Sequence, residues 1–147
     1  MLGSRGHLLW IGLSTLLCVG TSKAGGDAAS NLDVVEFKTT TRNASGLVRC
    51  GLFERKGWLK KPVRSSVAKI NGREALCKFT SVPKGEYGIS AFHDENSNEK
   101  LDTNLFGMPT EDYCASRNAR GTFGPPSFDD AKFRYRGGRK RLEALMK

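Results

Sequence analysis

The sequence predicts an all-β protein: an antiparallel β-sandwich of about seven strands, immunoglobulin-like or prealbumin-like, preceded by a signal peptide. Short segments in which apolar and polar residues alternate recur along the chain. Turn residues separate these segments, and no stretch before the C-terminal tail shows a helical period. A small barrel is the competing arrangement of such strands.

Residues 1–24 are expected to form a cleavable signal peptide. Arg5 precedes an apolar run over residues 8–19, and Ser22-Lys23-Ala24 provides the small residues that signal peptidase requires, with the cut before Gly25. The run is shorter than the roughly 20 apolar residues of a membrane-spanning helix. We therefore expect an extracytoplasmic protein, periplasmic or secreted, in which residues 25–31 form a short linker.

The β-sandwich domain is expected to cover residues 32–136. Residues 32–38 form its first predicted strand, and residues 42–46 the turn after it. Residues 47–54 form the second strand, in which alternate positions place three apolar residues on one face: Val48, Cys50 and Leu52.

A hairpin is predicted between residues 67–70 and residues 74–79. Asn71-Gly72 separates these two apolar segments, and it is a strong signal for a two-residue turn because both of its positions need positive φ. Asn71 and Gly72 are therefore expected to be the two residues of the turn.

The second half of the domain contains fewer strand signals. Residues 87–93 alternate as a strand, residues 94–129 read as a long irregular passage rich in Gly, Pro, Asn and Asp, and residues 131–135 alternate again as a closing strand. Residues 137–147 are left as a basic C-terminal tail.

Charge is unevenly distributed along the chain. The formal net charge of +9 falls to +7 when the leader is removed, because Arg5 and Lys23 leave with it. Residues 134–147 contain six basic residues against Glu143, which predicts a solvated extension; contact with an anionic envelope surface is the functional alternative. A nucleic-acid binder is expected to present basic residues interleaved with aromatic residues on one surface, and the signal peptide argues against such a partner. The sequence indicates no oligomeric state.

Three cysteines follow the leader. Cys50 and Cys77 each lie on the apolar face of a predicted strand, so they are expected to form a disulfide in an oxidising compartment. Cys114 would then be a free thiol. A Cys/His zinc site is not supported, because His93 is the only histidine after the leader.

The most specific motif is a candidate calcium loop. Asp94, Asn96, Asn98 and Asp102 would supply side-chain oxygens and Lys100 a backbone carbonyl, in a spacing that matches part of an EF-hand loop. Calcium requires six or more oxygens at about 2.3–2.6 Å, and alternate residues of a curled loop can provide them.

Two positions depart from that loop, so any calcium site should be weak. Glu99 replaces the glycine of the sharp turn, and Leu105 replaces the glutamate that would complete the ligand set. In the alternative interpretation, Asp94, Asn96 and Asn98 are Asx-turn residues that bind only backbone N–H groups.

Other functions receive less support. His93 beside Asp94 suggests a hydrolase, but neighbouring residues of a strand point to opposite faces, which disfavours a dyad. A carbohydrate-binding module would use Trp58, Tyr87 or Tyr113 to stack on a sugar, with core packing as the simpler interpretation of these aromatic residues. The leading hypothesis is a non-enzymatic extracytoplasmic module with a weak calcium loop.

Several segments together resemble a family of exported bacterial proteins, domain of unknown function 2141. The resemblance covers residues 32–133 and rests on these motifs: Gly85-Glu86-Tyr87, His93-Asp94-Glu95-Asn96, Gly107-Met108-Pro109-Thr110-Glu111-Asp112-Tyr113 and Gly124-Pro125-Pro126-Ser127-Phe128. It implies a signal peptide, a sandwich-like domain and no established activity. Glu99 and Cys114 depart from the family pattern.

Overall fold

The computed structural model describes residues 33–147. The predicted signal peptide and linker, residues 1–24 and 25–31, lie outside this part of the chain. The strands are β1 (Val34–Thr40), β2 (Leu47–Phe53), β3 (Arg64–Asn71), β4 (Glu74–Thr80), β5 (Gly85–Asp94), β6 (Tyr113–Ala115), β7 (Phe133–Tyr135) and β8 (Arg139–Leu145). The short helices are η1 (Arg55–Gly57), η2 (Ser116–Asn118) and α1 (Phe128–Ala131).

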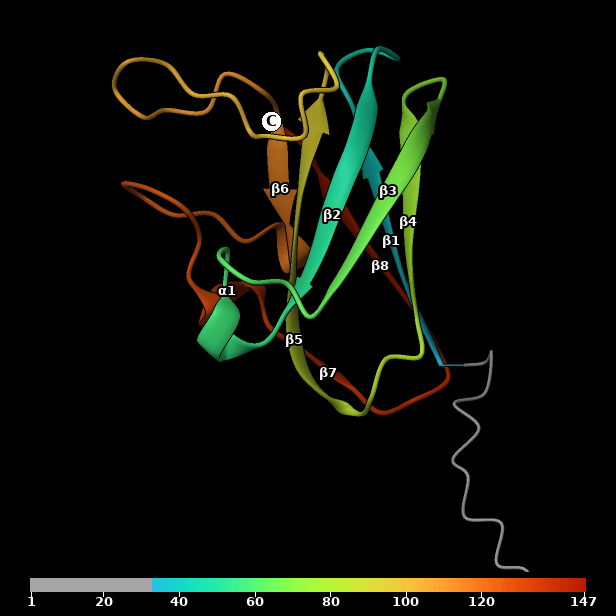
Figure 1. Ribbon diagram of the computed structural model, residues 1–147. Helices are drawn as coiled ribbons and strands as arrows, with labels where there is room; N and C mark the ends of the chain where they lie inside the picture. Colours follow the sequence, from blue (N-terminus) through green and yellow to red (C-terminus); the bar gives the residue numbers. More distant parts are fainter. Residues whose placement is uncertain (1–32) are drawn as a thin grey trace, which may run out of the picture.

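The protein is all-β, as predicted, but its strands form one nearly closed sheet. The spatial order is β6-β5-β2-β3-β4-β1-β8, and β7 pairs with the lower part of β5 (Figure 1). Every pair is antiparallel except β1 with β8, which is parallel. The predicted antiparallel sandwich is therefore corrected to a mixed, barrel-like sheet.

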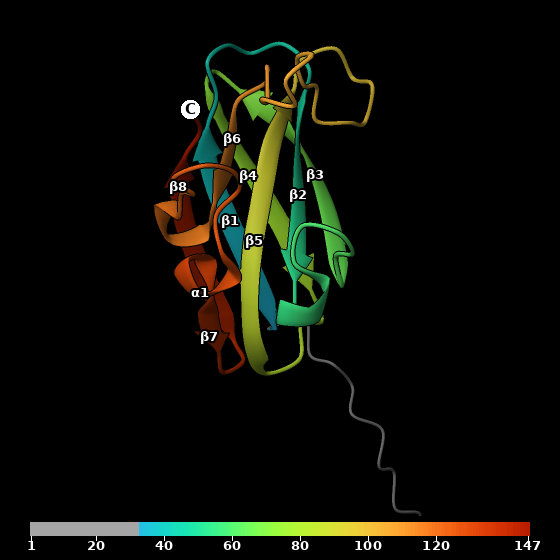
Figure 2. The same ribbon diagram turned by 90° about the vertical axis from the view of Figure 1, so that its left-hand side faces the viewer.

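Backbone and side-chain hydrogen bonds close the gap between the two ends of this sheet. Tyr113, the first residue of β6, exchanges two backbone bonds of 3.3 Å with Lys147. Asn118 in η2 accepts a bond of 2.8 Å from the N–H of Leu145. η2 and α1 lie beside this seam (Figure 2), so β8 is covered there rather than left as a free edge.

The core is formed by the inward-facing residues of the strands. Val48, Cys50 and Leu52 are buried together, as the alternation in β2 predicts. β5 contributes Tyr87, Ile89 and Ala91 from alternate positions. Because β5 ends at Asp94, this residue lies at the rim of the barrel.

The hairpin between β3 and β4 differs from the prediction by one residue. Asn71 still pairs with Glu74, so the two turn residues are Gly72 and Arg73, and of these only Gly72 has a positive φ, of 65°. The glycine takes the conformation that side chains disfavour, which frees Asn71 to remain in the strand.

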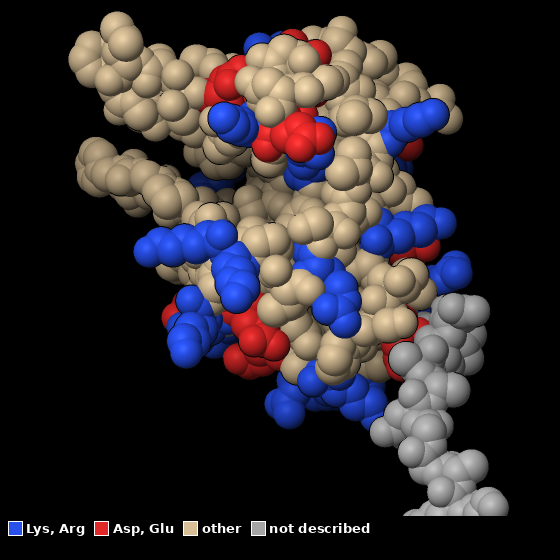
Figure 3. Space-filling model, viewed as in Figure 1, with Lys and Arg blue, Asp and Glu red and all other residues tan. Residues whose placement is uncertain are grey.

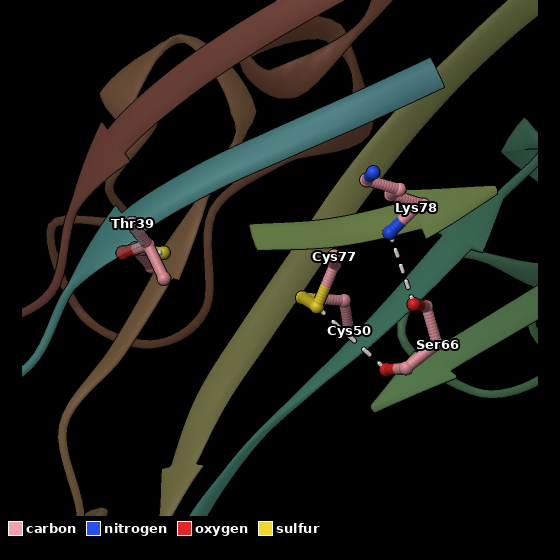
Figure 4. Close-up of a disulfide and its surroundings, with 6 residues drawn as sticks. Thr39, Cys50, Ser66, Cys77 and Lys78 are labelled. Carbon is pink, nitrogen blue, oxygen red and sulfur yellow. Dashed lines mark hydrogen bonds between the residues drawn. A yellow bond between two sulfur atoms is a disulfide. The ribbon is translucent and has the colours of Figure 1, made fainter. Parts of the chain in front are cut away.

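Cys50 in β2 and Cys77 in β4 form the expected disulfide, with Cα atoms 6.4 Å apart. β3 lies between these strands in the sheet, but its ladder with β4 covers only Ile70 and Asn71. Where β3 and β4 separate, Ser66 Oγ accepts a bond of 3.0 Å from the N–H of Lys78 (Figure 4). The disulfide therefore joins the two halves of the sheet across this separation.

The C-terminal segment is a strand, so the prediction of a solvated tail is wrong. β8 pairs with β1 over its whole length, from Val34 opposite Arg139 to Thr40 opposite Leu145. Ala144 and Met146 are buried. The alternation in β8 was not recognised from the sequence because most of its outward-facing positions are charged, which a solvent-exposed strand face tolerates.

No helix within residues 33–147 has the length and apolar character needed to cross a membrane.

Candidate functional site: the acidic loop after β5

The candidate loop leaves the sheet at Asp94, the last residue of β5, and the chain returns at β6. It projects from the upper end of the molecule in Figure 1. Its base lies against β2 and the turn that precedes β2, because Leu47 pairs with Asp94. The rigid sheet thus fixes the first predicted calcium ligand.

Asp94 is fully buried and accepts three hydrogen bonds. Oδ2 accepts from Arg49 Nε at 2.6 Å and from the N–H of Glu99 at 3.0 Å, and Oδ1 accepts from the N–H of Asn98 at 3.0 Å. Burial opposes ionisation, but Arg49 and the two backbone N–H groups outweigh it and lower the pKa of Asp94. The carboxylate therefore remains charged and organises the first turn of the loop.

The side chains of Asn96 and Asn98 both contact the carboxylate of Asp102. Asn96 Nδ2 donates to Asp102 Oδ2 at 2.7 Å, and Asn98 Nδ2 donates to Asp102 Oδ1 at 2.8 Å. The amide oxygens accept backbone bonds: that of Asn96 from the N–H of Asn98, and that of Asn98 from the N–H of Lys100. These bonds are Asx turns, as the alternative interpretation expects, and the amide nitrogens rather than the amide oxygens face Asp102.

Glu99 adopts the left-handed conformation in which a glycine would be less strained. Its φ is 69°, and its N–H is one of the donors to Asp94. A non-glycine residue there costs on the order of 1 kcal/mol. The side chain offsets part of this cost, because Glu99 Oε1 accepts a bond of 3.0 Å from Arg49.

Glu111, like Arg49, is a residue of the site that the sequence did not indicate. It is 9% exposed, and its two carboxylate oxygens accept from the N–H groups of Glu95 (3.0 Å) and Asp102 (3.1 Å). It therefore joins the two ends of the candidate loop from outside the motif. Leu105, at the position of the EF-hand glutamate, is fully exposed. The only signal in the sequence was an acidic pair, Glu111-Asp112, directly before β6.

Within residues 33–147, no three His, Cys, Asp or Glu side chains are arranged around a common metal position. The loop instead offers a mixed set: the carboxylates of Asp94 and Asp102 and the amides of Asn96 and Asn98. Such oxygen donors suit a hard cation such as calcium rather than zinc.

The family model described as "Uncharacterized protein conserved in bacteria (DUF2141)" matches residues 38–143, which include the whole loop and most of the barrel. The chain belongs to this DUF2141 family. No match to the chain is found among curated proteins or among solved structures.

In this DUF2141 domain, His93 and Asp94 do not form a dyad. The His93 ring is fully buried and its Nε2–H donates to the carbonyl of Ser45 at 2.6 Å, whereas Asp94 points to Arg49. His93 Nδ1 has no hydrogen-bond partner and lies 3.7 Å from Glu95 Oε1. His93 thus holds the turn before β2 against the base of the loop.

The aromatic residues considered for sugar binding are engaged mainly in packing. Tyr87 is 4% exposed. Trp58 packs edge-on against Phe53 and Phe128, with ring centroids 5.5 and 5.7 Å apart, and its Nε1–H donates to the carbonyl of Pro126. Tyr113 is half-buried at the start of β6.

The free thiol of Cys114 is buried on the inner side of β6, next to Thr39 Oγ1 at 3.5 Å. Burial raises its pKa to about 11, so it is protonated near neutral pH. A protonated, inaccessible thiol is a packing group rather than a nucleophile.

Proposed function

We propose that the protein is an exported, non-catalytic module whose loop over residues 94–102 is ordered by calcium. The observation that supports this most is the convergence of Asn96 and Asn98 on Asp102 beside the fixed carboxylate of Asp94. Four oxygen-bearing side chains, from positions 94, 96, 98 and 102, therefore lie in one small loop.

Calcium would replace hydrogen bonds that now hold these groups together. Rotation of the Asn96 and Asn98 amides would turn their oxygens toward the cation, and Asp102 would exchange two N–H donors for the metal. Lys100 would contribute its carbonyl oxygen. Because Arg49 occupies one oxygen of Asp94, the affinity should be in the millimolar range of extracellular modules.

The assignment to an extracytoplasmic compartment has two supports. The leader has the composition of a cleavable signal peptide, and the Cys50–Cys77 disulfide suits an oxidising environment. Expression with the native leader should give a mature protein that begins at Gly25, as measured by N-terminal sequencing. A full-length cytoplasmic product with free Cys50 and Cys77 thiols would contradict export.

Direct calcium binding tests the site. Titration calorimetry of the wild type with calcium should give saturable binding in the millimolar range, with weaker binding of magnesium, which demands octahedral geometry and retains its waters. Asp102→Ala should abolish binding, because Asp102 is the carboxylate on which both asparagines converge.

Glu95→Gln is the matched control. Glu95 lies within the loop, and its replacement by glutamine removes one negative charge, as Asp102→Ala does. The Glu95 carboxylate accepts a hydrogen bond from Asn43, outside the proposed ligand set. The Glu95→Gln variant should bind calcium as the wild type does. Equal loss of binding in both variants would show that calcium responds only to the net charge of the loop, which would contradict a specific site.

A further inference from the structure

The folding of the C-terminal segment into β8 gathers cationic residues at the lower end of the molecule. Two adjoining hollows, of about 520 and 390 Å³, share Arg134 and Arg136 in their walls. Lys84 lines the first hollow, and Arg139 and Lys140 line the second. Figure 3 shows Lys and Arg side chains gathered at this end, below β7.

The turn between β7 and β8 fixes this arrangement. Gly137 and Gly138 both have positive φ, of 96° and 76°, and they reverse the chain so that Arg139 follows closely on Arg136. The side chain of Lys84 lies across Gly137, where an added Cβ would be 3.2 Å from Lys84 Cε. A residue from the β4–β5 turn is thereby brought to the arginines of the C-terminal segment.

None of these five cations forms a salt bridge with a described residue. Basic side chains elsewhere form salt bridges with acids: Arg55 pairs with Asp129, and Arg141 pairs with Glu36. Two acids lie near the cluster. Glu86 lines the first hollow, and the carboxylate of Asp33 accepts a bond of 2.7 Å from the N–H of Gly138. Five cations against these two acids leave the cluster with a net positive charge.

We propose that this cluster, Lys84, Arg134, Arg136, Arg139 and Lys140, binds the phosphate groups of an anionic bilayer surface. Cations presented at one end of a molecule suit an extended anionic surface, which can contact all of them at once. A small ligand would require an enclosed pocket with fixed polar groups. Single-stranded nucleic acid would require exposed aromatic rings, and the only aromatic residue in the walls, Tyr135, is 1% exposed.

The proposal is independent of calcium, because the acidic loop lies at the opposite end of the barrel. This polarity also orients the protein: bound through the basic end, it would hold the loop after β5 away from the bilayer (Figure 1). The anionic bilayer attracts the basic end and repels the acidic loop, so both forces favour this orientation.

Co-sedimentation with vesicles tests the proposal. The purified protein should bind vesicles that contain phosphatidylglycerol, should not bind phosphatidylcholine alone, and should be released by high salt. Arg134→Gln with Arg136→Gln should weaken binding by roughly twenty-five-fold, since each cation near an anionic surface contributes about five-fold. Lys84→Gln, on a different turn, should weaken it by about five-fold.

Lys69→Gln with Lys147→Gln is the control that removes the same charge elsewhere. Lys69 stands opposite Leu47 and Lys147 opposite Tyr113, both near the acidic loop, and neither forms a salt bridge within residues 33–147. This variant should bind nearly as the wild type does. An equal loss in both double variants, no binding to phosphatidylglycerol, or tighter binding of an oligonucleotide than of vesicles through the same residues would overturn the proposal. Matching circular dichroism spectra would show that all variants are folded.

Discussion

Gly46 and Gly72 show how the surroundings of a single residue decide its role. Both have a φ of +65°. A Cβ added at Gly46 would lie 2.0 Å from the carbonyl oxygen of Asp94, whereas nothing lies within 4 Å of one added at Gly72. Gly46 thus allows the turn before β2 to contact the backbone at the start of the candidate loop.

Alanine at these two positions should therefore have very different effects. Gly72→Ala should lower the free energy of unfolding by about 1 kcal/mol, the cost of the left-handed conformation. Gly46→Ala should lower it by more than about 3 kcal/mol, because a backbone contact must also be displaced. Urea unfolding measures both. Similar losses in the two variants would contradict the close approach of Gly46 to Asp94.

The lowered pKa of Asp94 predicts a pH dependence of stability. Its folded pKa lies below the unfolded value of about 3.9, so its contribution is present above that value and is lost as the pH falls through the folded pKa. Asp94→Asn should cost about 1–3 kcal/mol near neutral pH, where Arg49 loses its charged partner. The difference between variant and wild type should shrink in unfolding experiments below about pH 4. A difference that is constant with pH would contradict the ionised, paired carboxylate.

Among the elements, β8 changes the interpretation of the molecule most. As a strand it completes the pairing of β1, buries Ala144 and Met146, and places Arg139 and Lys140 in the basic cluster. As a solvated tail it would do none of these.

Truncation after Arg136 separates the two interpretations. Loss of β8 removes the parallel ladder to β1 and exposes the neighbouring core, so the free energy of unfolding should fall by more than about 3 kcal/mol, or the protein should fail to fold. Thermal unfolding followed by circular dichroism measures this change. An unchanged melting temperature would show that the segment is dispensable and would contradict the placement of β8.

At the scale of the whole molecule, the disulfide joins the two halves of the sheet. Because it closes a segment with a sequence separation of 27, it should stabilise the fold by roughly 3–4 kcal/mol. Cys50→Ala with Cys77→Ala should lose about this amount in urea unfolding. Cys114 is buried, so alkylation of the oxidised wild type should label it only in denaturant. Labelling of Cys50 or Cys77 under those conditions would contradict the bond.

The sequence predicted the all-β class, the main strands and the disulfide, because strict alternation survives in β2 and β5 and places Cys50 on the buried face. It could not predict how the sheet closes. That depends on the long-range contacts of β6, η2 and β8, three elements whose short or highly charged sequences carry weak local signals.

The candidate site was also only partly predictable from the sequence. The spacing of Asp94, Asn96, Asn98 and Asp102 predicts a curled loop, because Asp and Asn side chains form Asx turns. It does not predict that the amide nitrogens of Asn96 and Asn98 face Asp102. Glu111 and Arg49 could not be included, because only the pairing of β2 with β5 and the return of the chain toward β6 bring them to the loop.

Thermal unfolding tests most directly the proposal that calcium orders the loop after β5. If calcium binds only the folded state, stability must rise by RT ln(1 + [L]/Kd), about 1.4 kcal/mol at ten times Kd. The melting temperature of the wild type should therefore rise steadily as calcium is increased through the millimolar range, relative to the protein in chelator. An identical melting temperature in calcium and in chelator across that range would contradict the claim and leave the loop as a set of Asx turns.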